Sequence, residues 1–71
     1  MELNVVKEIN VVINGVSFKN VTIFVTEYCL HIYSKQRWID MISVEDIKSF
    51  NSSNPEVDYE VNQFLSELEY K

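Results

Sequence analysis

The dipeptide Asn14-Gly15 most strongly constrains how this chain folds. It follows a run in which apolar residues occupy alternate positions from Leu3 to Ile13, a period typical of a β-strand with one buried face. Asn-Gly between two such runs favours a two-residue hairpin, because both central residues of that turn need a positive φ. The sequence therefore predicts that the chain begins with two antiparallel strands joined at this dipeptide.

The second strand changes the face on which its apolar side chains lie. Val16 and Phe18 are apolar at even positions, whereas the apolar residues of the segment 21–25 are at odd positions. The change falls at Lys19-Asn20, where either a β-bulge or a tight turn would account for it.

Further strands are expected over Tyr28–Tyr33 and Trp38–Ser43, with a polar turn at residues 34–37. Residues 43–50 combine a helix-start pattern with a short apolar run, and we expect one helical turn followed by an edge strand. Val and Ile supply 17 of the 71 residues and Leu only four, a balance that favours strands over helices.

The C-terminal segment has the period of an amphipathic helix. Asn54 is a candidate N-cap and Pro55 suits the first helical position. One side of the expected helix carries Val57, Val61, Phe64, Leu65 and Leu68. We therefore predict one small α+β domain over residues 1–71: an antiparallel β-meander of four to five strands (about 2–50), a linker (51–54) and one helix (about 55–70).

The segment Ile23–Ser34, followed by Ile39–Ile47, resembles the central hairpin of bacterial pleckstrin-homology-like (GRAM-like) domains. In both, a threonine closes one strand and an alternating strand follows; the resemblance spans about residues 23–50. It implies a C-terminal helix at one end of a bent sheet. It does not imply phosphoinositide binding, because the family's proline is missing at Met41-Ile42-Ser43 and the basic lipid-binding loop is absent.

Charge and composition argue against most chemistries. The net charge of −5 disfavours nucleic acid as a partner. One Cys, one His and one Gly leave no disulfide framework, multi-Cys/His metal site or glycine-rich phosphate loop. Cys29 and His31 lie two apart on a strand, which places their Cβ atoms about 6.5–7 Å apart, too far for a direct nucleophile–base pair. We predict a non-enzymatic protein without a metal ion or cofactor.

The same features predict where the protein resides. No apolar run approaches the roughly 20 residues that a membrane helix needs, and no secretory signal is visible at the N-terminus. A cytoplasmic protein is therefore expected, without a membrane partner. Its small size and seven asparagines favour a bacterial or phage origin.

Aromatic residues are the best candidates for a binding surface. They fall on both faces of the expected strands, more than one helix covers, and aromatic side chains are enriched at protein interfaces. The candidate residues are Tyr28, His31, Tyr33 and Trp38. We expect an interaction or regulatory module that forms a homodimer and binds another, unidentified protein.

The acidic charge is concentrated in the helix, where residues 55–71 carry −4 of the total. Glu56, Glu60 and Glu67 flank one side of the apolar stripe. They suggest an alternative function, an acidic inhibitor that mimics nucleic acid and blocks a host or defence enzyme. A third hypothesis, an enzyme or metal protein, would require a site around His31 at a dimer interface.

Overall fold

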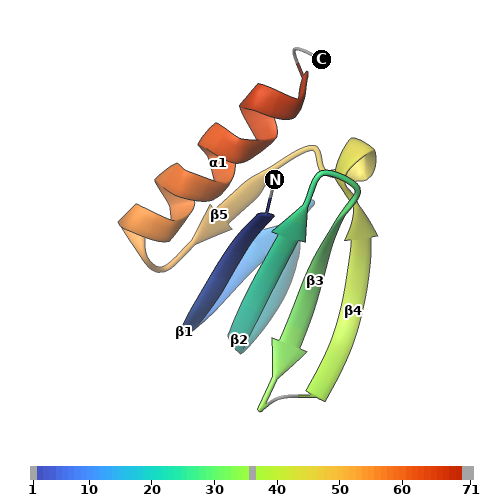
Figure 1. Ribbon diagram of the computed structural model, residues 1–71. Helices are drawn as coiled ribbons and strands as arrows, with labels where there is room; N and C mark the ends of the chain where they lie inside the picture. Colours follow the sequence, from blue (N-terminus) through green and yellow to red (C-terminus); the bar gives the residue numbers. More distant parts are fainter. Residues whose placement is uncertain (1, 36, 70–71) are drawn as a thin grey trace.

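The computed structural model describes residues 2–35 and 37–69, and it shows the predicted α+β fold (Figure 1). Four strands form an antiparallel meander, a single turn of 3₁₀ helix follows, and a fifth strand precedes the C-terminal helix. The elements are β1 Glu2–Ile13, β2 Val16–Thr26, β3 Cys29–Ser34, β4 Arg37–Ser43, η1 Val44–Asp46, β5 Phe50–Ser52 and α1 Pro55–Glu69. The strand order is β4-β3-β2-β1-β5, so β5 lies beside β1 and does not extend the meander at β4.

The predicted hairpin turn is confirmed. Asn14 and Gly15 have φ values of 52° and 84°, and Ile13 pairs with Val16 across the turn. The Asn14 side chain also holds the segment that leads to β5. Its Nδ2 donates to the carbonyl oxygen of Asp46 (2.8 Å), and its Oδ1 accepts from the backbone N–H groups of Lys48 (2.6 Å) and Ser49 (3.2 Å).

A β-bulge accounts for the change of face in β2. The register advances by two residues in β1, from Ile9 to Val11, against three in β2, from Val21 to Phe18. Asn20 takes a left-handed conformation there (φ 56°), and its N–H donates to Oδ1 of Asn10 (3.0 Å). Of the two alternatives open from the sequence, the bulge is therefore the one that forms, and the strand continues through it.

β5 corrects the predicted linker. Residues 51 and 52 were expected in a connection of turn-forming residues, yet Asn51 pairs with Val12 and Ser52 with Val11 in the sheet. Ser53 then donates its N–H to the Asn10 carbonyl oxygen (2.9 Å) and accepts from the Asn10 N–H at Oγ (3.1 Å). These bonds to β1 override the local preference for a turn, and the linker shortens to residues 53–54.

The helix begins as predicted. Oδ1 of Asn54 accepts from the N–H groups of Glu56 (3.0 Å) and Val57 (3.4 Å), which makes it the N-cap. α1 packs against β5 and β1 (Figure 1). Val57, Val61 and Phe64 join the buried cluster of the sheet. Leu65 and Leu68 are only half-buried. Residue 70, the predicted end of the helix, lies outside the described residues.

Candidate functional site

The two faces of the sheet differ in what covers them. The face beneath α1 carries the buried aliphatic residues of β1, β2 and β3, among them Ile23, Leu30 and Ile32, each at most 1% exposed. Side chains alternate along a strand, so their neighbours point to the opposite face. That opposite face carries Phe24, His31, Tyr33, Trp38 and Met41, which we call the aromatic face.

Strand register places these five side chains together. Phe24 pairs with His31, His31 with Met41, and Tyr33 with Trp38, and paired residues point to the same side of a sheet. The ring centroids of Phe24 and His31 are 5.9 Å apart, and those of His31 and Tyr33 are 6.4 Å apart. The rings therefore form a continuous row across β2 and β3, which Trp38 and Met41 extend onto β4.

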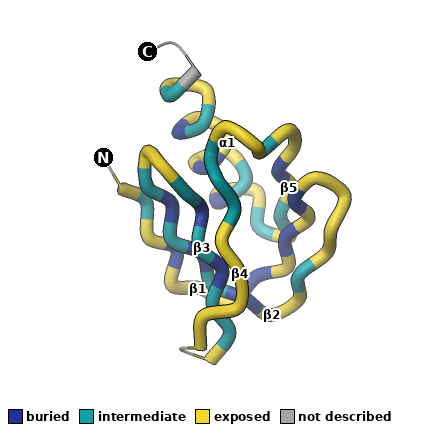
Figure 2. The backbone as a smooth tube through the Cα atoms, turned by 90° about the vertical axis from the view of Figure 1, so that its right-hand side faces the viewer, coloured by how far each residue is buried: buried dark blue, intermediate teal, exposed yellow. Residues whose placement is uncertain are grey.

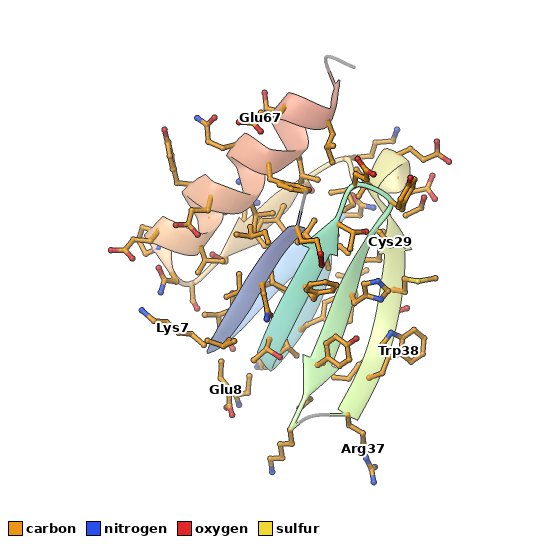
Figure 3. All side chains as sticks on the ribbon, in the orientation of Figure 1. Lys7, Glu8, Cys29, Arg37, Trp38 and Glu67 are labelled. Carbon is orange, nitrogen blue, oxygen red and sulfur yellow. The ribbon has the colours of Figure 1, made fainter. Side chains whose placement is uncertain are left out.

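The outer end of this face projects into solvent. Trp38 is 54% exposed and Met41 50% exposed, and β4 is exposed along most of its length (Figure 2). Trp38 lies on β4, far from Glu67 on the helix, while Arg37 points away from the end of the β3–β4 hairpin (Figure 3). Phe24, His31 and Tyr33 are half-buried, so the exposed part of the aromatic face is its β4 side. Exposed aromatic and methionine side chains are enriched at protein-binding surfaces.

A hollow of about 560 Å³ adjoins the row of rings on the side of β1. The residues that line it include Asn4, Val6, Thr22 and Tyr33, together with the charged Glu8 and Lys35. Val6 is 76% exposed, more than any other large apolar residue in the described part of the chain. The aromatic face thus combines a projecting side, at Trp38, with a recessed side, at the hollow.

The side chain of Asp40 occupies a backbone N–H group on the free edge of β4. Val44 donates its N–H to the Tyr28 carbonyl oxygen (2.9 Å), which makes Cys29 and Ser43 a non-hydrogen-bonded pair. Because such pairs alternate, the N–H of Met41 points away from β3. Oδ1 of Asp40 accepts that N–H (2.8 Å). A charged group at an edge opposes the addition of another strand, so the face offers a better contact surface than the edge.

Tyr28 lies apart from the other three predicted residues. Oγ1 of Thr26 accepts from the N–H groups of Tyr28 and Cys29, both at 3.1 Å, and this turn ends β2 before Tyr28. Tyr28 is 73% exposed and lines a groove of about 810 Å³ between the β2–β3 turn, η1 and the C-terminal half of α1. The structure therefore groups His31, Tyr33 and Trp38 and separates Tyr28 from them.

Phe24 and Met41 belong to the aromatic face but were not among the predicted site residues. Phe24 could have been predicted from the sequence, because it lies between Ile23 and Val25 and so points to the face opposite these two buried residues. Met41 could be placed only once the register of β4 against β3 was known.

The three predicted acidic residues share one side of α1. Glu56, Glu60 and Glu67 are all exposed, and at 100° per residue they fall within about 40° of one another. We call them the acidic stripe.

The described residues contain no group of three or more His, Cys, Asp or Glu side chains able to hold a metal ion. Within residues 2–35 and 37–69, no helix has both the length and the hydropathy to traverse a bilayer.

Comparison with protein-family models, with curated proteins and with solved structures finds no match to this chain. The resemblance to pleckstrin-homology-like domains stays a prediction.

Proposed function

We propose that this protein is a non-enzymatic interaction module that binds a second copy of itself through the aromatic face. The observation that carries the proposal is the row of Phe24, His31, Tyr33 and Trp38 on the side of the sheet that α1 leaves uncovered. Burial of exposed apolar surface drives most protein association, at roughly 25 cal/mol per Å². Contact with a second copy would remove these rings from water.

The shape of the face supports a symmetric contact. In a twofold dimer the same surface of both copies meets, so a projection must find a recess elsewhere on that surface. Trp38 projects, and the hollow lined by Val6, Thr22 and Tyr33 lies on the same face. Such an arrangement allows Trp38 of each copy to enter the hollow of the other.

Single substitutions at either end of the face test this dimer. The chain is expected to run at about twice its monomer mass of 8.4 kDa in light scattering at tens of micromolar. Trp38→Ala removes the projection and Val6→Asp places a charge in the recess, and we expect either one to weaken self-association about tenfold or more. The two positions lie on β4 and β1, so a shared effect is explained by contact across the dimer.

A matched control is Tyr59→Ala, which removes another exposed ring, 67% accessible, from the helix. This variant should keep the dimer. A wild-type mass of 8.4 kDa at tens of micromolar would refute the homodimer. An intact dimer in both the Trp38 and Val6 variants would refute the aromatic face as its interface.

The acidic stripe supports a second candidate function, an inhibitor that occupies the nucleic-acid groove of another protein. Three exposed carboxylates on one side of a helix form a compact negative surface. Changing Glu56, Glu60 and Glu67 together to Gln should then weaken binding to a basic target, and added salt should weaken the wild type. Binding that responds to neither change, measured by fluorescence anisotropy between about 50 and 500 mM salt, would dismiss this function.

A further inference from the structure

The groove beside Tyr28 is a second surface, distinct from the aromatic face. Its apolar walls come from the loop after β4 and from the last turns of the helix. Val44, Ile47, Leu65 and Leu68 line it, and all four remain half-buried. Val57, Val61 and Phe64, on the earlier turns of the same helix, are fully part of the core, whereas Leu65 and Leu68 pack against the core with only part of their surface covered. The surface of Leu65 and Leu68 that the core leaves open lines the groove.

The charge around the groove is mainly negative. Glu27 and Glu45 line it and are exposed, against one base, Lys48. The part of α1 that lines the groove is its C-terminal end, and the last turn of α1 contains no basic residue. A helix C-terminus carries a partial negative charge of about half an elementary charge, which adds to that of the two carboxylates.

We propose that this groove binds a short basic amphipathic segment of another protein, with apolar side chains against Leu65 and Leu68 and Lys or Arg side chains facing Glu27 and Glu45. The charge selects this occupant over two others. The amphipathic helix of a second copy, residues 55–71, carries a charge of −4 and would be repelled by an already negative groove. An anionic lipid surface would be repelled for the same reason. The proposal does not depend on the dimer formed through the aromatic face.

Titration of the ¹⁵N-labelled full chain with a synthetic 14-residue peptide of Leu and Lys, arranged as an amphipathic helix, tests the proposal. We expect amide shifts at the groove residues, including Glu27, Val44 and Leu68, and little change at Trp38 on the aromatic face. A peptide with Glu in place of Lys should not bind. A combined Glu27→Gln and Glu45→Gln variant should bind the Lys peptide about tenfold more weakly at low salt.

The matched control removes the same number of charges from the acidic stripe, by Glu56→Gln and Glu60→Gln, and should leave affinity within about twofold. Leu68→Ser tests the apolar wall of the groove. This variant should bind the Lys peptide more weakly, while the amide peaks away from residue 68 keep their wild-type positions and so report a folded chain. Shifts that fall on the acidic stripe, or equal effects of the two charge variants, would overturn the groove in favour of general acidic attraction. Absence of binding, or shifts confined to the aromatic face, would also overturn it.

Discussion

Replacing Asn14 with alanine is expected to lower the free energy of unfolding by about 2–3 kcal/mol. Two effects combine. Alanine is strained at the positive φ of this turn, and the substitution removes the three side-chain hydrogen bonds to the segment 46–49, leaving only the bond from the residue 14 N–H to the Ser49 carbonyl oxygen. A chain of 71 residues has a total stability of only about 4–10 kcal/mol, so the loss is a large fraction of it. Urea unfolding followed by Trp38 fluorescence measures it.

Asn14→Gly separates the two effects. Glycine accepts the positive φ without strain, so this variant loses the side-chain hydrogen bonds and adds some entropy to the unfolded chain, and it should be destabilised by about 1–2 kcal/mol. If glycine restores full stability, the contacts to Asp46, Lys48 and Ser49 contribute nothing. If alanine and glycine are equally destabilising, the backbone strain of alanine is no larger than the entropic cost of glycine, about 0.5–1 kcal/mol.

Asn14 both forms the hairpin turn and bonds to residues 46–49, and only the first of these roles could be predicted from the sequence. The turn itself could be predicted, because it depends on two adjacent residues and the alternation on either side. The helix could be predicted for the same reason, from a local period and from the N-cap at Asn54. Both elements are specified by residues that lie close together in the chain.

The position of β5 could not be predicted, because it depends on partners far away in the sequence. Asn14 bonds to a segment more than 30 residues later, and Asn10 bonds to Ser53, 43 residues later. No local pattern identifies an asparagine that will meet such partners. Residues 51 and 52 therefore read as a linker although they form a strand.

In the candidate site, too, the features set by local sequence could be predicted and those set by distant partners could not. Tyr33 and Trp38 could be placed at a surface from composition and alternation, but their neighbours Phe24 and Met41 required the register of three strands. Tyr28 was expected on the same strand as Tyr33, since its apolar ring fits the alternation. The hydroxyl of Thr26 captures the N–H of Tyr28 instead, and this bond turns the chain before β3 begins.

Phe64→Ala is expected to have the largest effect on stability, about 3–5 kcal/mol. Phe64 is buried with Val57 and Val61 against the sheet. An isolated helix of 15 residues is only marginally stable in water, so α1 depends on these contacts. Without it, Val11 and Ile13, each 1% exposed, would face solvent. Far-ultraviolet circular dichroism and Trp38 fluorescence should therefore report one shared transition, at a lower urea concentration than in the wild type.

A shared transition requires that α1 be part of the core and not an appendage to a sheet that folds alone. Gln63→Ala is the matched control, because residue 63 is exposed on the same helix and alanine favours helix formation. It should leave the midpoint unchanged or slightly raised. If Phe64→Ala removes the helical signal while the Trp38 transition stays at the wild-type midpoint, the sheet is independently stable. The proposed groove would then depend on a helix that can detach, whereas the aromatic face, which β2, β3 and β4 form without α1, would persist.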